Sequence, residues 1–254
     1  MNIKNILICG GGMMGKNIAF VFASNPDYQI GVYDLYQTDV PAGIRTNTRQ
    51  LVDHGVMTDA DVEDRLSRIA FTTDMDSELV SSADLVIEAI IEDLKAKQAV
   101  FASLEDLCPP HTIFASNTSS ISLTALAAAT KRPSQVVGMH FFSPVPRMKL
   151  CEVIFGLLTT QDVLDAVKSV AEQMGKTIIQ ADDKPGFIVN RALLPMLNEA
   201  CVIVGSYIGS VEEMDNGMKL GCNHPMGPLE LADMIGLDIL LDVMTTMEKE
   251  IGAK

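Results

Sequence analysis

The feature that most constrains this chain lies near its N-terminus, where an apolar run meets a cluster of glycines. Residues 5–9 (Asn-Ile-Leu-Ile-Cys) predict a buried strand, and residues 10–15 (Gly-Gly-Gly-Met-Met-Gly) follow at once. A second apolar run over residues 30–33 ends in Asp34, nineteen positions after Gly15 (34 − 15). A strand, a glycine turn, a helix start and an acid in this order indicate a βαβ unit that binds a dinucleotide.

Each part of this turn has an expected role. Gly10 permits the tight turn, Gly12 lets backbone N–H groups approach a pyrophosphate at the helix N-terminus, and Gly15 lets the helix pack on the strand. Asp34 would accept hydrogen bonds from the adenosine ribose and would repel a 2′-phosphate. We therefore predict NAD as the cofactor in preference to NADP. The predicted cofactor contacts in this stretch are Gly10, Gly12, Met13, Met14, Gly15 and Asp34.

Composition narrows the classes of partner. A net charge of −14 argues against nucleic acid or an anionic membrane surface as a partner. No stretch approaches the roughly 20 apolar residues of a membrane-spanning helix.

The five cysteines show no CxxC and no metal-type spacing, so we expect no metal site and mostly buried thiols of a reducing compartment. The first predicted strand leaves no room for a signal peptide, so we expect a cytoplasmic protein.

The pattern of apolar residues predicts two domains. Residues 1–182 alternate strand-like and helical runs, which predicts an α/β fold with a Rossmann-type doubly wound sheet. Residues 183–254 predict a smaller all-helical domain. The expected strands beyond the first βαβ unit are 69–71, 85–90, 113–115, 136–140 and 150–155. The expected helices are 45–54, 59–68, 94–107, 163–174, 187–208, 211–219, 228–235 and 237–250, with Thr58 and Asp61 as a reciprocal cap of the second.

Separated motifs in the middle and at the end of the chain carry a more specific pattern. They are residues 116–120 (Ser-Asn-Thr-Ser-Ser), 138–146 (Gly-Met-His-Phe-Phe-Ser-Pro-Val-Pro), 148–153 (Met-Lys-Leu-Cys-Glu-Val), 184–191 (Lys-Pro-Gly-Phe-Ile-Val-Asn-Arg), 218–221 (Met-Lys-Leu-Gly) and 225–228 (Pro-Met-Gly-Pro). Over essentially its whole length the chain resembles the L-3-hydroxyacyl-CoA dehydrogenases, and among them the short bacterial 3-hydroxybutyryl-CoA enzymes. The resemblance implies NAD-dependent oxidation of a short-chain (S)-3-hydroxyacyl-CoA, the reverse reduction, and a homodimer.

The resemblance also implies which residues act. Family members use a serine, a histidine, a glutamate and an asparagine, which match Ser119, His140, Glu152 and Asn190 here. Asn190 belongs to the second predicted domain, so the reaction centre would lie in the cleft between domains, and domain closure would complete it. By the same resemblance Glu92, Lys97 and Asn117 line the nicotinamide half of the cofactor site.

The chemistry needs these residue types. Oxidation of a secondary alcohol removes an O–H proton, and histidine holds or releases protons near neutral pH. A carboxylate such as Glu152 fixes the tautomer of the ring and supports its charged form. Ser119 and Asn190 would donate hydrogen bonds to the reacting oxygen and orient it.

Plainer readings stand beside these. Without the resemblance, His140 reads as a structural histidine and Ser119 as part of a loop and helix cap. Asn190 reads as a polar position early in a helix. Glu152 is a charge within a β-rich run and needs a partner in any case.

The sequence departs from the family pattern at three places. Ser143 stands where members commonly have asparagine, and the region before Thr58 lacks their usual lysines. Arg45 and Arg49, which share a helix face, are the candidates for the phosphates of coenzyme A, with Arg65 and Arg68 as further candidates and a solvated helix face as the equal alternative. Members also usually continue past the position of Lys254, so a truncated helical domain is one interpretation of this end.

Two other functions stay open at this point. One is a β-hydroxyacid dehydrogenase that acts on a free acid, although such enzymes often use a catalytic lysine. The other is a non-catalytic NAD-binding relative.

Overall fold

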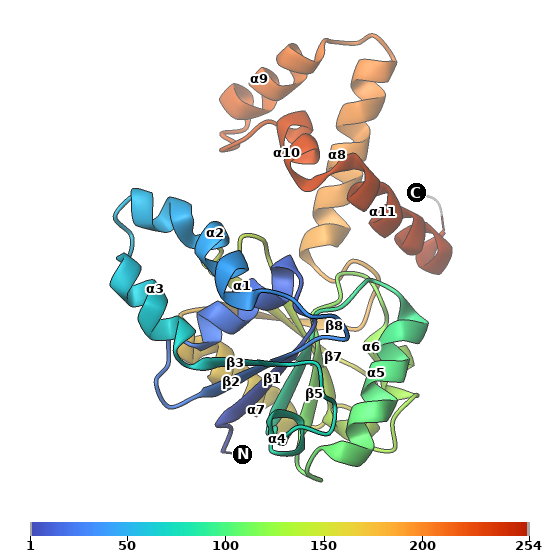
Figure 1. Cartoon of the computed structure of the whole chain (residues 1–254). Coiled ribbons are helices and arrows are strands. Elements are labelled where there is room, and N and C mark those ends of the chain that lie inside the picture. The colour runs from blue at the N-terminus through green and yellow to red at the C-terminus, as the bar shows by residue number, and fades with distance from the viewer. Residues whose placement is uncertain (1, 253–254) are drawn as a thin grey trace. The chain divides into compact units, whose positions relative to one another are not determined.

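The computed structural model describes residues 2–252 and divides into two compact units, Met1–Asp183 and Lys184–Lys254 (Figure 1). The division falls one residue after the boundary expected from the sequence. Unit 1 contains every strand of the described chain, and unit 2 is helical.

One sheet of eight strands forms the centre of unit 1, with the strand order β3-β2-β1-β4-β5-β6-β7-β8. All neighbouring strands are parallel except β6 and β7, which are antiparallel. The chain starts in the middle of the sheet and winds outward in both directions, so the predicted Rossmann-type doubly wound fold is confirmed. The strands are β1 (Asn5–Cys9), β2 (Gln29–Tyr33), β3 (Ile69–Thr72), β4 (Leu85–Glu88), β5 (Ile113–Ser116), β6 (Val136–Phe141), β7 (Leu150–Phe155) and β8 (Thr177–Asp182).

The central strands are apolar throughout because both faces of the sheet are covered. Ile6 and Ile8 of β1 belong to the core cluster that also contains Ile18 of α1 and Val163 of α7. On α5, Phe101 packs against Phe114 of β5 with ring centroids 5.6 Å apart. The helices of unit 1 are α1 (Met13–Phe22), α2 (Val40–Asp53), α3 (Asp59–Leu66), α4 (Glu78–Ser81), α5 (Leu94–Leu107), α6 (Leu123–Ala127) and α7 (Gln161–Gln173).

Most of the predicted elements form, with shifts that local chemistry explains. The helix predicted from residue 45 begins at Val40, because Asp39 caps it by accepting a hydrogen bond from the Ala42 backbone N–H. The reciprocal cap between Thr58 and Asp61 is confirmed. The sequence interpretation missed the short helices α4 and α6 and the strand β8, which pairs only with β7 at the edge of the sheet.

Unit 2 consists of α8 (Val189–Gly205), α9 (Val211–Gly221), α10 (Pro228–Ile235) and α11 (Leu237–Ile251). The first helix was predicted from residue 187 but begins at Val189. Gly186 and Phe187 have positive φ angles of 76° and 46°, which a helix does not allow. The unit has its own apolar cluster, formed by Leu194, Leu197, Ala232, Leu240 and Met247. Among residues 2–252, no helix combines the length and apolarity needed to cross a bilayer.

Candidate active site

The glycine turn after β1 has the geometry that its sequence predicts. Gly10 has a φ of +113°, and a Cβ atom there would lie 2.5 Å from the carbonyl oxygen of Ala89. A Cβ on Gly15 would lie 1.8 Å from the carbonyl oxygen of Gly10. Both distances are far below a van der Waals contact, so each position excludes any side chain.

Gly12 differs from these two because nothing lies within 4 Å of the position of its Cβ. It precedes α1, whose N-terminus has no side-chain cap. Asp34 braces the turn by accepting hydrogen bonds from the backbone N–H groups of Gly11 at 2.6 Å and Tyr36 at 3.0 Å. Open space before an uncapped helix N-terminus fits the pyrophosphate of a dinucleotide.

The next two residues, Met13 and Met14, differ in burial. The Met13 side chain is 61% exposed at the start of α1, whereas Met14 packs against the apolar core. Of the two, Met13 is therefore the one that is accessible at the start of α1.

His140 and Glu152 face each other across the only antiparallel pair of strands in the sheet. They are direct register partners on β6 and β7, and both are buried. The Nδ1 atom of His140 lies 2.6 Å from Oε2 of Glu152, and its Nε2 atom lies 3.1 Å from Oγ of Ser119. A carboxylate only accepts hydrogen bonds, so Nδ1 carries the proton and, in the neutral ring, Nε2 accepts from the Ser119 hydroxyl. The three predicted side chains of unit 1 therefore form one connected chain.

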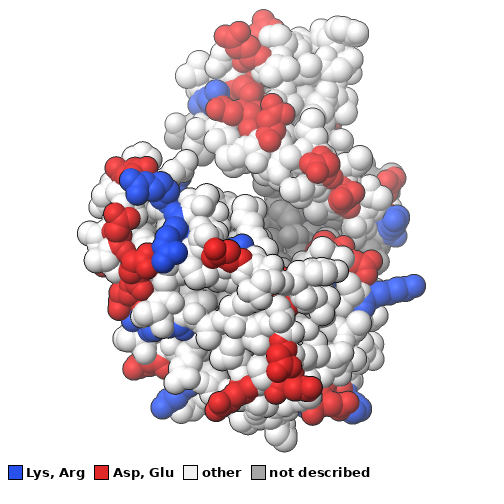
Figure 2. Space-filling view, viewed as in Figure 1, with Lys and Arg blue, Asp and Glu red and all other residues white. Residues whose placement is uncertain are grey.

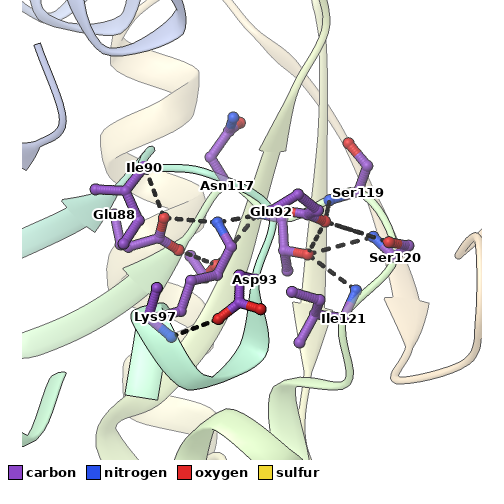
Figure 3. A network of polar contacts seen from close by, with 12 residues as sticks. Glu88, Ile90, Glu92, Asp93, Lys97, Asn117, Ser119, Ser120 and Ile121 are labelled. Carbon is purple, nitrogen blue, oxygen red and sulfur yellow. Dashed lines mark hydrogen bonds and ion pairs between the residues drawn. The ribbon is translucent and has the colours of Figure 1, made fainter. Parts of the chain in front are cut away.

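Glu92 organises the loop that carries Ser119 (Figure 3). Its Oε1 accepts hydrogen bonds from the Thr118 hydroxyl at 2.5 Å and from the backbone N–H groups of Ser119 at 3.0 Å and Ser120 at 3.2 Å. Burial raises the pKa of this carboxyl, but the nearby Lys97 charge and these hydrogen bonds outweigh it, so the pKa lies below its ordinary value. Glu92 is therefore an anion at neutral pH and an anchor for the loop.

Behind Glu92 lies a buried ion pair that the sequence interpretation did not identify. Lys97 Nζ lies 2.6 Å from Oε1 of Glu88 and 3.2 Å from Oε2 of Glu92, and its side chain is 1% exposed. Glu88 also accepts a hydrogen bond from the Ser116 hydroxyl at 2.6 Å. The sequence signal for this pair was Glu88, a charged residue at the end of the apolar run that forms β4. The ammonium of Lys97 therefore pairs with two carboxylates. Its predicted contact with the cofactor stays a prediction.

Asn117 links the same loop to the strand of the histidine. Its Oδ1 accepts a hydrogen bond from the Phe141 backbone N–H at 2.9 Å. The side chain therefore lies at the carboxyl ends of β5 and β6, where ligands of doubly wound sheets bind.

The arginines proposed for substrate phosphates lie on α2 and already have anionic partners. Arg45 donates two hydrogen bonds to Glu63, at 2.7 and 2.8 Å, and Arg49 lies 2.8 Å from Asp53. All four side chains are at least half exposed. Figure 2 shows basic and acidic side chains interleaved over the region of α2 and α3. A phosphate would compete with the carboxylates for these arginines.

The further arginine candidates are also engaged. The guanidinium of Arg65 lies 4.8 Å from the ring centroid of Phe20, and Arg68 pairs with Asp64 at 2.6 Å.

The fourth predicted catalytic residue, Asn190, stands in the first turn of α8 in unit 2 and is half-buried. Its role stays a prediction.

Three of the five cysteines are buried, as the sequence predicts, and two are exposed. Cys9, Cys108 and Cys151 are buried, and burial raises the pKa of Cys108 to about 11 and that of Cys151 to about 12. Cys201 and Cys222 on unit 2 are exposed. Cys108 and Cys151 are therefore core residues, and their raised pKa values make them poor nucleophiles.

Comparison with known proteins identifies the class. A family model for the NAD-binding domain of 3-hydroxyacyl-CoA dehydrogenase matches residues 5–184, and one for the C-terminal domain matches residues 186–254. The chain belongs to the 3-hydroxyacyl-CoA dehydrogenase family, and it has the NAD-binding domain of that family.

Individual relatives of the chain carry names from the same family. A probable 3-hydroxybutyryl-CoA dehydrogenase of Bacillus subtilis is 44% identical over 99% of this chain and 88% of its own length. The 3-hydroxybutyryl-CoA dehydrogenase of Clostridioides difficile is 42% identical over 97% of this chain and 88% of its own length. The crystal structure of (S)-3-hydroxybutyryl-CoA dehydrogenase PaaH1 from Ralstonia eutropha matches with a TM-score of 0.90 and 40% identity over 99% of this chain and 89% of that chain.

Proposed function

We propose that this chain oxidises a short-chain (S)-3-hydroxyacyl-CoA, of which 3-hydroxybutyryl-CoA is the model substrate, to the 3-oxoacyl-CoA with NAD, and catalyses the reverse reduction. The observation that carries the proposal is His140, whose ring is bound by Glu152 on one side and faces Ser119 on the other. Family membership supports it, since the named relatives are 3-hydroxybutyryl-CoA dehydrogenases.

The cofactor would be held by the turn from Gly10 to Gly15 and by Asp34. Gly12 and the uncapped start of α1 leave room for the pyrophosphate, and Asp34 presents a carboxylate beside the turn. Glu92, Lys97 and Asn117 are proposed for the nicotinamide half. When bound, NAD accepts the hydride from the substrate carbon, and the residues of this chain handle the proton.

His140 is the proposed general base of the oxidation and the general acid of the reduction. Its Nε2 would take the hydroxyl proton of the alcohol while the bond from carbon to oxygen becomes a carbonyl. The ring then carries a positive charge, which the Glu152 carboxylate at 2.6 Å stabilises. Ser119, which lies 3.1 Å from Nε2, would donate its hydrogen bond to the substrate oxygen. Asn190 is proposed as a second donor.

The acyl-CoA substrate is an anion, and the chain carries a net charge of −14. Local basic groups must therefore attract its phosphates, and Arg45 and Arg49 are the proposed ones. By the same family likeness we propose a homodimer and a cytoplasmic location. Analytical ultracentrifugation tests the homodimer.

Steady-state turnover of acetoacetyl-CoA tests the proposed function. We expect reduction with NADH to be much faster than with NADPH, because Asp34 repels a 2′-phosphate. We expect no comparable reduction of free acetoacetate. Preference for the free acid would favour a β-hydroxyacid dehydrogenase, and absence of thioester turnover at high enzyme concentration would favour a non-catalytic relative.

A further inference from the structure

The loop that carries Ser119 runs from the end of β5 to the start of α6. Glu92 holds its first half through Thr118, Ser119 and Ser120. The second half ends at Ser122, which caps α6 by accepting a hydrogen bond from the Ala125 backbone N–H. A helix of five residues has little stability of its own, so α6 needs an external anchor.

Asp183 supplies that anchor from a distant part of the sequence. Its Oδ2 accepts hydrogen bonds from the Ser122 hydroxyl at 2.8 Å and from the Thr124 backbone N–H at 2.8 Å. Its Oδ1 accepts from the Leu123 backbone N–H at 2.9 Å. Hydrogen bonds to a carboxylate are stronger than those between neutral groups, and an anion is favoured at a helix N-terminus. The Ser119 loop is thus held between two carboxylates, one at each end.

The position of Asp183 in the chain gives this contact a second consequence. Asp183 follows the last residue of β8 and ends unit 1, and Lys184-Pro185-Gly186 begins the linker to α8. The carboxylate that fixes the end of the Ser119 loop therefore also fixes the point at which the linker leaves unit 1.

We propose that Asp183 is a positioning residue that holds the Ser119 loop so that the Ser119 hydroxyl stays in hydrogen-bond reach of His140. The inference rests on the proposed function. Glu92 still holds the first half of the loop when Asp183 is removed, so the loop would shift and not unfold. A shift of this kind costs roughly 10- to 100-fold in rate.

The first test replaces Asp183 by alanine and compares it with Asp182→Ala, in which the neighbouring exposed carboxylate of β8 is removed. We expect kcat with acetoacetyl-CoA to fall roughly 10- to 100-fold in Asp183→Ala, with the KM for NADH unchanged. Asp182→Ala should match the wild type. Asp183→Asn, whose amide oxygen still accepts hydrogen bonds, should recover part of the rate. Equal rates in Asp183→Ala and wild type would overturn the proposal.

A double-mutant comparison separates positioning from a general loss of structure. If Asp183 acts through Ser119, then Asp183→Ala should cost little in a Ser119→Ala background, because the group it positions is gone. Effects that multiply in full would contradict the proposal and assign Asp183 a role independent of Ser119.

Hydrogen exchange tests the anchor without any turnover. The backbone amides of Leu123 and Thr124 should exchange faster in Asp183→Ala than in the wild type, while the amides of β1 should not change. Unchanged exchange at Leu123 and Thr124 would overturn the anchor. A wild-type protein without thioester turnover would overturn the proposed function instead, so the two failures are distinguishable.

Discussion

Charged side chains occur in two very different settings in unit 1. Along α2 and α3, Arg45 pairs with Glu63 while both side chains are more than half exposed. At the carboxyl ends of β4 and β6, Lys97 forms an ion pair with Glu88 and the His140 ring forms a hydrogen bond with Glu152, and these four side chains are at most 5% exposed. The distances between the paired atoms are similar, at 2.6 to 2.7 Å, so distance alone does not distinguish the two regions.

Solvent makes the difference. Water screens the exposed pairs, so each contributes little to stability and its partners can be exchanged for others. A buried charge cannot recover its hydration when its partner is removed, so each buried pair is costly to break. The buried side chains therefore keep their partners, whereas an arginine on the α2–α3 surface can leave its carboxylate and bind another anion.

The largest expected effect is that of His140→Ala on turnover. Removal of a general acid or base costs roughly 10²- to 10⁴-fold, so we expect a loss of kcat of that size with acetoacetyl-CoA and NADH. NADH binding, followed by its fluorescence, should be retained because the glycine turn is untouched. Near-normal turnover of the variant would remove His140 from the mechanism.

Lys97→Met should have the largest effect on stability. It leaves Glu88 buried without its cation, so we expect the free energy of unfolding to fall by about 3–5 kcal/mol in urea denaturation. Lys131→Met is the matched control, since Lys131 pairs with Asp106 at 2.7 Å on the surface. It should leave stability within error. The double variant Glu88→Gln/Lys97→Met should regain much of the loss. Equal losses of stability in the two lysine variants would show that burial does not make the Lys97 pair costlier to break than the surface pair.

Glu92 should give the buried region a pH dependence. Because its pKa in the folded protein lies below the ordinary value of 4.5, its contribution to stability is complete above that pH and is lost as the pH falls through the folded pKa. Glu92→Gln should therefore lose less stability than the wild type on acidification below about pH 4.5. Urea denaturation at a series of pH values measures this. Parallel curves for the two proteins would show that the carboxylate is not held as described.

Arg45→Ala should have the smallest effect, and only on substrate binding. If Arg45 contacts the phosphates of coenzyme A, the KM for acetoacetyl-CoA should rise roughly two- to fivefold, with stability unchanged. The KM for acetoacetyl-N-acetylcysteamine, which has no phosphate, should not change. Equal behaviour of both thioesters would make this surface a solvated helix face.

Local features of unit 1 are easier to predict from the sequence than contacts between separate elements. The glycine turn and the cap at Thr58 are local, so spacing along the chain was enough to predict both. His140 and Glu152 lie twelve positions apart, and the resemblance implied that they act together. Their contact depends on β6 and β7 being antiparallel, which the sequence interpretation did not predict. Glu88 and Lys97 are nine positions apart, on β4 and α5, whereas Asp183 and Ser122 are 61 positions apart, and tertiary packing brings both pairs together. No spacing rule reports such contacts, and the sequence interpretation missed them.

The proposed mechanism depends on the contact between His140 and Glu152, and the rate of Glu152→Gln in two backgrounds is its sharpest test. In the wild-type background we expect kcat for acetoacetyl-CoA reduction to fall strongly, because the amide no longer supports the charged ring. In the His140→Ala background the same change should add almost nothing, since residues that act as a unit are not additive. If Glu152→Gln slows both backgrounds by the same factor, Glu152 does not act through His140, and the proposed mechanism is wrong.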